Sequence, residues 1–215
     1  MALFTEVSND EARALLRRLQ LGELVALRGI EGGIENTNYF LTSDQGEFVL
    51  TLFERLTAQQ LPFYLHLMKH LAQGKVPVPD PRADSDGDIL HAVCGKPAAV
   101  VNKLRGKSQL APQGEHCAAV GAMLARMHLT GRDFDRQQPN LRGLPWWNET
   151  APVVLPYLSE PQAALLRSEL AYQNHVAAGA AYAALPRGPV HADLFRDNVM
   201  FDGEELTGFF DFYFA

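Results

Sequence analysis

Cysteine is scarce in this chain, which holds only Cys94 and Cys117 among its 215 residues. Neither belongs to a C-x-x-C pair, and no group of His and Cys residues has the spacing of zinc ligands. Basic runs are missing, and the formal net charge of −6 makes nucleic acid and anionic membranes poor partners. No apolar run is long enough to span a bilayer, and the N-terminus lacks the basic and apolar regions of a signal peptide. We therefore expect a reduced, soluble, cytoplasmic protein.

The residues that are present predict an α+β chain, rich in strands first and in helices later. Hydrophobic residues make up 47% and charged residues 20%, and 215 residues suffice for two small lobes. A capping box at Ser8 and Glu11 opens the first helix, and turn residues separate the β-like runs. The lobe boundary is expected near residue 102, which divides the chain into 1–102 and 103–215. Expected strands cover residues 23–29, 38–42, 47–53, 88–93, 96–102, 199–201 and 206–210, and expected helices cover 9–20, 57–73, 112–129 and 160–185.

The most informative segment has the spacing H-x-D-x-x-x-x-N at residues 191–198, followed by D-F at 211–212. Kinase-type phosphoryl transfer needs one carboxylate that holds the acceptor hydroxyl, and an amide and a second carboxylate that hold magnesium. Asp193 fits the first role, and Asn198 and Asp211 fit the second. A hairpin through the turn 202–203 is expected to bring Asn198 and Asp211 close together. An isolated H-x-D would serve as turn and cap residues, but this spacing in a hairpin favours catalysis.

A glycine-rich turn lies between the first two expected strands. Glycines let backbone amides approach phosphate oxygens, and Asn and Thr side chains add donors. The alternative is an ordinary turn, but the position at the first hairpin of a kinase-like lobe favours phosphate binding. The expected contacts are Gly32, Gly33, Asn36 and Thr37.

The lysine that protein kinases carry on their third strand is absent. Thr51 occupies the expected position, and the next helix, residues 57–73, contains no Asp or Glu that would pair with a lysine. The two absences are consistent, because a buried lysine without its acid would carry an unpaired charge. Magnesium on Asn198 and Asp211 is the main candidate for neutralising a triphosphate. The nearby cations Lys103, Arg105 and Lys107 are a further candidate or only a solvated hinge.

Together these segments resemble the aminoglycoside-phosphotransferase-like kinases, a family with the bilobal protein-kinase-like fold. Within that family the chain most resembles the homoserine kinases of the threonine pathway, and the resemblance covers essentially all of the chain. The segments that carry it are G-G-I-E-N-T-N-Y-F at 32–40, F-V-L-T-L-F-E at 48–54, V-G-x-x-L-A-x-M-H at 120–128, R-G-L-P-W at 142–146, H-A-D-L-F-R-D-N at 191–198 and D-F at 211–212.

The resemblance implies an ATP- and Mg²⁺-dependent enzyme that phosphorylates the side-chain hydroxyl of L-homoserine to O-phospho-L-homoserine. It implies that Asp193 orients the hydroxyl, that His191 supports the catalytic loop, and that backbone groups of Val101, Lys103 and Leu104 meet adenine. Arg196 is expected to contact phosphate, or else only to pair with its neighbour Asp197.

The sequence also departs from the family pattern. The D-F-G triplet reads Asp211-Phe212-Tyr213, and the chain ends at Ala215, where such kinases usually continue for several helices. We therefore expect a C-terminally truncated form. Two alternatives stay open: a kinase of the same fold for another acceptor (an aminoglycoside, choline, ethanolamine, methylthioribose or hydroxylysine), or a non-catalytic nucleotide-binding remnant. The oligomeric state is undetermined.

Overall fold

The computed structural model describes residues 4–31 and 35–215. The chain forms two compact units, residues 1–136 with 189–215, and residues 137–188. The first unit holds the β-strands, and the second is helical. None of the helices within the described ranges combines the length and the apolar character needed to cross a bilayer.

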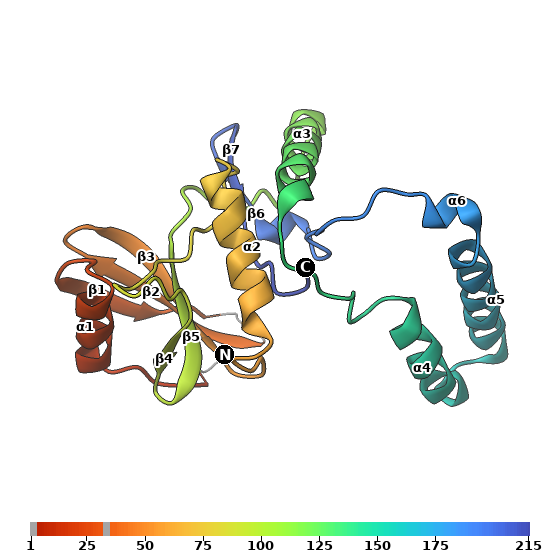
Figure 1. Cartoon of the computed structure of the whole chain (residues 1–215), viewed down its shortest axis with the longest axis horizontal. Coiled ribbons are helices and arrows are strands. Elements are labelled where there is room, and N and C mark those ends of the chain that lie inside the picture. The colour runs from red at the N-terminus through yellow and green to blue at the C-terminus, as the bar shows by residue number, and fades with distance from the viewer. Residues whose placement is uncertain (1–3, 32–34) are drawn as a thin grey trace. The chain divides into compact units, whose positions relative to one another are not determined.

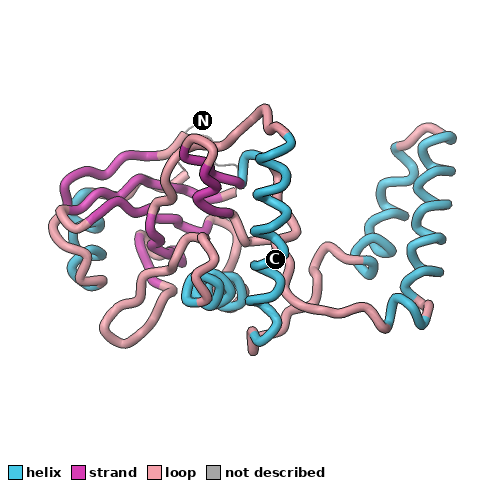
Figure 2. The backbone as a smooth tube through the Cα atoms, turned by 90° about the horizontal axis from the view of Figure 1, so that it is seen from above, coloured by secondary structure: helices cyan, strands magenta, loops and turns pink. Residues whose placement is uncertain are grey.

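The first unit is built on a five-stranded antiparallel sheet with strand order β1-β2-β3-β5-β4 (Figure 1). Figure 2 shows its strands lying side by side. The turn between β2 and β3 uses Gly46 at φ 157°, and the β4–β5 turn uses Gly95 at φ 71°, where glycine carries no Cβ penalty. The expected strands are confirmed, although the fourth is shorter than predicted. The bounds are β1 Leu24–Gly29, β2 Asn36–Ser43, β3 Gly46–Phe53, β4 His91–Val93 and β5 Lys96–Asn102.

One face of this sheet is covered by α1, Asn9–Arg18. The predicted capping box is confirmed, because the Ser8 side chain accepts from the backbone N–H of Glu11, whose carboxylate accepts from the N–H of Ser8. Side chains alternate across a strand, so every second residue of β2 and β3 faces α1. Leu41 and Leu50 therefore lie in the core beneath this helix.

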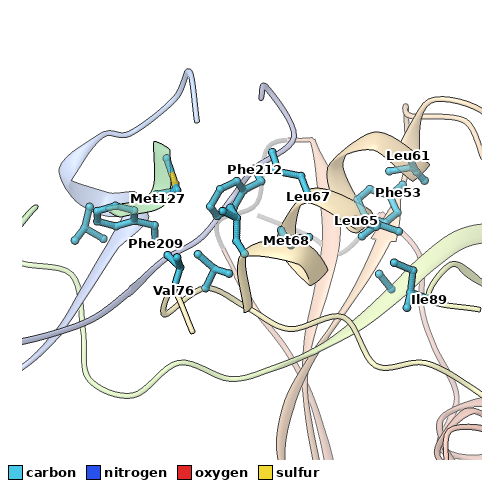
Figure 3. Close-up of a cluster of buried hydrophobic side chains, with 14 of the residues drawn as sticks. Phe53, Leu61, Leu65, Leu67, Met68, Val76, Ile89, Met127, Phe209 and Phe212 are labelled. Atoms are coloured by element: carbon cyan, nitrogen blue, oxygen red, sulfur yellow. The ribbon is translucent and has the colours of Figure 1, made fainter. Parts of the chain in front are cut away.

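The other face of the sheet contributes to a second core, which also receives α2, α3 and a two-stranded hairpin. Figure 3 shows Phe53 of β3 and Met68 of α2 in one buried cluster with Phe209 and Phe212, which come from the chain's last segment. The predicted hairpin is confirmed, with Val199 paired to Phe209. The bounds are α2 Leu61–Gln73, α3 Gly114–Thr130, β6 Val199–Asp202 and β7 Glu205–Phe209.

The second unit is a helical hairpin made of α4, Leu144–Val154, and α5, Glu160–Ala177. The side-chain amides of Asn148 and Asn174 join the two helices through reciprocal hydrogen bonds of 3.0 and 2.9 Å. The expected helix over 160–185 is interrupted at Gly179, which has extended dihedrals and caps the short helix α6, Ala180–Ala183. The helix α4 was not predicted, because its segment has no clear apolar period.

Candidate active site

A cavity of about 360 Å³ lies in the first unit, against the sheet face opposite α1. Its size is typical of a small-molecule site. It is lined by β2, β3, β5 and the residues after β5, and by side chains from the β6–β7 hairpin and the segment after it. The predicted nucleotide or metal residues that line it are Asn36, Thr51, Val101, Lys103, Leu104 and Asp211.

One end of the cavity is apolar and borders the segment that follows β5. Phe40, Val49 and Val101 lie side by side on three neighbouring strands, and Met200 of β6 lines the same cavity. The backbone N–H of Lys103 donates to the carbonyl of Glu47 at 3.1 Å, which anchors this segment to β3. Flat apolar walls next to backbone polar groups suit a planar heterocycle. Met200 had no signal in the sequence, because its side chain enters the cavity only through the fold.

The segment after β5 is also anchored to the hairpin. Lys107 and Phe201 exchange two backbone hydrogen bonds of 2.9 Å. Gly106 has φ 84°, and a Cβ at this position would lie 1.9 Å from the carbonyl oxygen of Phe201. Only glycine permits this approach. The neighbouring Arg105 lies within 4 Å of Asp202 and Glu205, so its charge already has acidic partners on the hairpin.

Thr51 is hydrogen-bonded rather than standing alone at the lysine position. Its hydroxyl donates to Oδ1 of Asn38 at 2.7 Å, and the side chain of Tyr213 lies next to it. Both Asn38 and Tyr213 line the cavity. The sequence analysis assigned no role to Asn38, although its spacing of two residues from Asn36 on one strand was a usable signal.

Thr37 lies elsewhere, which corrects its expected contact with phosphate. The side chain is 1% exposed and points to the α1 face, because it alternates with Asn36 and Asn38. Its hydroxyl donates to Oε1 of Glu54 at 2.6 Å, and Glu54 also pairs with Lys96. The structure therefore does not bring the Thr37 hydroxyl into the cavity. The expected contacts of Gly32 and Gly33 fall outside the described residues.

His191 connects the loop of residues 191–198 to the segment before Asp211. The ring is 1% exposed, its Nδ1 accepts the backbone N–H of Asp193 at 3.3 Å, and its Nε2 lies 2.8 Å from the carbonyl of Phe210. A carbonyl only accepts, so this arrangement requires the neutral imidazole with its proton on Nε2. Burial lowers the pKa of His191, which keeps the ring neutral.

Asn198 holds Asp193 in place. Its Nδ2 donates to the backbone carbonyl of Asp193 at 2.7 Å and to the Asp193 carboxylate at 3.2 Å. An amide that donates through nitrogen keeps its oxygen for a cation. The backbone carbonyl of Asn198 accepts the N–H of Phe210 at 3.1 Å, which places Asn198 across the hairpin from the residue directly before Asp211. The proximity predicted for them is confirmed at the level of the backbone.

The carboxyl group of Asp211 has a strongly raised pKa. Burial raises the pKa of its carboxyl to about 6, helped by the negative charges of Asp193, Glu35 and Asp197. Its φ is 66°, and that of Ala192 is 62°, so both segments of the site hold left-handed residues that are not glycine.

A divalent cation fits this donor set. Asp211 supplies a carboxylate and Asn198 an amide oxygen, both ligand types that Mg²⁺ accepts, and Asp193 and Asp197 add further negative charge around Asp211. Among the described residues, no group of three or more His, Cys, Asp or Glu side chains is arranged to hold a metal ion. A cation here would therefore rely on few protein ligands, which is usual for Mg²⁺ bound together with phosphate groups.

Arg196 is exposed in the short 3-10 helix Arg196–Asn198, outside the lining of the cavity. The side chains of His191, Asp193 and Asn198 also lie outside that lining, but their hydrogen bonds connect them to the backbone around Asp211.

The profile described as "Phosphotransferase enzyme family" matches residues 26–215. The homoserine kinase of Polaromonas naphthalenivorans is 70% identical over 215 residues, which are 100% of this chain and 68% of that protein. The homoserine kinase of Burkholderia vietnamiensis is 57% identical over 223 residues, covering 100% of this chain and 67% of that protein. The chain thus spans about two thirds of the length of these curated relatives.

Solved structures show the same fold at much lower identity. An amicoumacin kinase, hAmiN, solved in complex with AMP-PNP, Ca²⁺ and Ami, matches with TM-score 0.67 and 21% identity over 93% of this chain and 63% of that chain. A spectinomycin phosphotransferase, APH(9)-Ia, in complex with ADP and its antibiotic, matches with TM-score 0.59 and 14% identity over 93% of this chain and 68% of that chain. This chain is a member of the phosphotransferase enzyme family and, within it, of the homoserine kinases.

Proposed function

We propose that this chain transfers the γ-phosphoryl group of ATP to the side-chain hydroxyl of L-homoserine, giving O-phospho-L-homoserine and ADP. The observation that carries the proposal is the contact of Asn198 Nδ2 with the Asp193 carboxylate, on a hairpin that leads directly to Asp211. This constellation supports phosphoryl transfer, and the 70% identity to a homoserine kinase supports the acceptor.

In this proposal Asp193 accepts a hydrogen bond from the acceptor hydroxyl and directs its oxygen toward the γ-phosphorus. The hydroxyl proton moves to the Asp193 carboxylate as the new P–O bond forms and the bond to the β-phosphate oxygen breaks. Asn198 keeps the carboxylate in one orientation, and neutral His191 holds the loop that carries it. Phosphoryl transfer depends mostly on positioning and charge stabilisation, so few side chains suffice.

Asn198 Oδ1 and the Asp211 carboxylate would hold Mg²⁺. When bound, the ion supplies the positive charge that a triphosphate needs. The structures of the relatives with AMP-PNP or ADP support a nucleotide in the cavity, with adenine against Phe40, Val49 and Val101.

Three further assignments belong to the same proposal. The two functional lobes are residues 1–102 and 103–215. Arg196, exposed on the catalytic loop, contacts the transferred phosphate. The protein works in the cytoplasm; the free thiols of Cys94 and Cys117 are compatible with such a reducing location.

The test is magnesium-dependent ADP release from ATP with L-homoserine as acceptor. We expect turnover that depends on homoserine, and loss of that turnover in Asp193→Asn with ATP binding retained. Choline, hydroxylysine, methylthioribose and an aminoglycoside serve as comparison acceptors. Faster turnover with one of these would contradict the homoserine assignment. ATP binding without turnover on any acceptor would favour a non-catalytic nucleotide-binding protein.

A further inference from the structure

The end of the cavity where phosphates would lie has no basic side chain among the described lining residues. Lys103 is the one cation of that lining, and it belongs to the apolar end. Its Nζ lies 2.9 Å from the Glu47 carboxylate and 5.1 Å from the centre of the Phe40 ring. A phosphate group therefore needs another donor.

The register of the sheet shows where that donor has to be. Phe40, Val49 and Val101 form one row across three strands, and Asn38, Thr51 and Ala99 form the next row on the same face. Two residues along a strand correspond to about 7 Å. A nucleotide whose base lies on the first row therefore has its phosphates near the second row, where Asn38 and Thr51 line the cavity.

The hydrogen bonds of this second row define which atoms of Asn38 remain available. The Thr51 hydroxyl donates to Asn38 Oδ1 at 2.7 Å, and the Tyr213 side chain lies next to Thr51. With Oδ1 occupied, Asn38 presents the two N–H groups of Nδ2 to the cavity.

We propose that Asn38 is the phosphate donor of this site, and that its amide binds the nucleotide's α- or β-phosphate in place of the absent third-strand lysine. Thr51 and Tyr213 are positioning residues, which fix the amide with its nitrogen toward the phosphates. The inference rests on the proposed function, since it assumes that ATP is the ligand. A neutral amide needs no acidic partner, which agrees with the absence of Asp and Glu from α2.

Asn38→Asp is the sharpest test, because it keeps the shape and the acceptor for Thr51 but replaces the donor with a negative oxygen. The dissociation constants of ATP, ADP and adenosine are measured by calorimetry with Mg²⁺ present. We expect ATP and ADP to bind roughly 10- to 100-fold more weakly, and adenosine to change by less than about twofold. Asn102→Asp is the control: Asn102 borders the cavity at the adenine end, so the same substitution there has a smaller effect on ATP relative to adenosine.

Two further variants separate binding from folding. Asn38→Leu removes the donor without adding a charge. We expect the same selective loss of affinity for ATP and ADP, but a smaller one than in Asn38→Asp. Tyr213→Phe and Thr51→Val should each weaken the binding of ATP but not of adenosine. The double variant should lose less ATP-binding free energy than the sum of the two single losses.

Unchanged ATP affinity in Asn38→Asp, or equal losses of ATP and adenosine, would overturn the assignment of Asn38. An unmodified chain that binds neither ATP nor adenosine would overturn the proposed function instead. The two failures are therefore distinguishable in the same experiment.

Discussion

The Nε2 of His191 lies 2.8 Å from the carbonyl oxygen of Phe210, the residue directly before Asp211. The same ring accepts the backbone N–H of Asp193 through Nδ1. One buried imidazole therefore connects the proposed hydroxyl-orienting carboxylate to the proposed metal carboxylate. Its neutral state is essential, because a second ring proton would face the N–H of Asp193, another donor.

Replacing His191 by Leu should lower kcat more than it raises KM for ATP. The change leaves the Asp193 N–H and the Phe210 carbonyl without their partner, so the free energy of unfolding should also fall by about 1–3 kcal/mol. Steady-state kinetics and denaturant unfolding measure the two effects.

The matched control for that prediction is His116→Leu. His116 is also buried, accepts a backbone N–H from Gln113 at 3.0 Å, and packs its ring against Phe201. It lies outside the catalytic loop. Equal losses of kcat in both variants would show that His191 acts only through stability.

The stability of the metal-free protein should depend on the ionisation of Asp211. Its pKa in the folded state is raised from 3.8 to about 6, chiefly by burial, so the folded protein binds this proton more tightly than the unfolded chain does. The stabilisation that protonated Asp211 gives the folded protein is fully present below about pH 4 and is lost as the pH rises through about 6. The loss is on the order of 3 kcal/mol.

The measurement is the melting temperature of the chain and of Asp211→Asn between pH 4 and 7.5, with a chelator present. We expect the melting temperature of the variant to rise relative to that of the unmodified chain as the pH increases. The other acidic groups titrate in both proteins, so the difference reports on Asp211. Adding Mg²⁺ at pH 7.5 should stabilise only the unmodified chain. A difference between the two proteins that does not vary with pH would contradict the raised pKa.

Gly106→Ala should disturb the connection between the sheet and the hairpin. A Cβ there would lie 1.9 Å from the Phe201 carbonyl oxygen, so the segment after β5 has to shift. We expect a loss of more than about 2 kcal/mol in the free energy of unfolding and a raised KM for ATP.

Gly87→Ala provides the comparison for this clash. Gly87 has φ 89°, close to the 84° of Gly106, but a Cβ there meets nothing within 4 Å. Backbone strain alone should cost about 1–2 kcal/mol in both variants. If the two variants were equally stable, the close contact with Phe201 would add nothing to the loss of stability, and the prediction would be wrong.

Thr37→Val should destabilise the protein without changing its affinity for ATP. The Thr37 hydroxyl donates to Glu54 and accepts the backbone N–H of Thr5 on the α1 face. Its removal should cost about 1–3 kcal/mol. Chemical unfolding and ATP titration separate the two effects. Weaker ATP binding at unchanged stability would restore the phosphate role that the strand's alternation argues against.

The sequence by itself determined the elements that depend on local patterns. The capping box of α1 and the strands around the turns at Gly46 and Gly95 follow from short-range chemistry, and the structure reproduces them. The apolar runs on either side of the turn at Asp202 and Gly203 likewise predicted the hairpin that brings Asn198 close to Asp211, because a tight turn brings its two ends together whatever lies around it.

Only the tertiary structure decided which polar side chains share the cavity. Thr37 and Asn38 are neighbours in the sequence, yet strand alternation sends one to the α1 face and the other to the cavity, and the side that is covered depends on α1. Only the packing of the last segment against the sheet brings Tyr213 next to Thr51, whose hydroxyl donates to Asn38. The raised pKa of Asp211 is equally a property of the fold, because burial and the charges of distant carboxylates produce it.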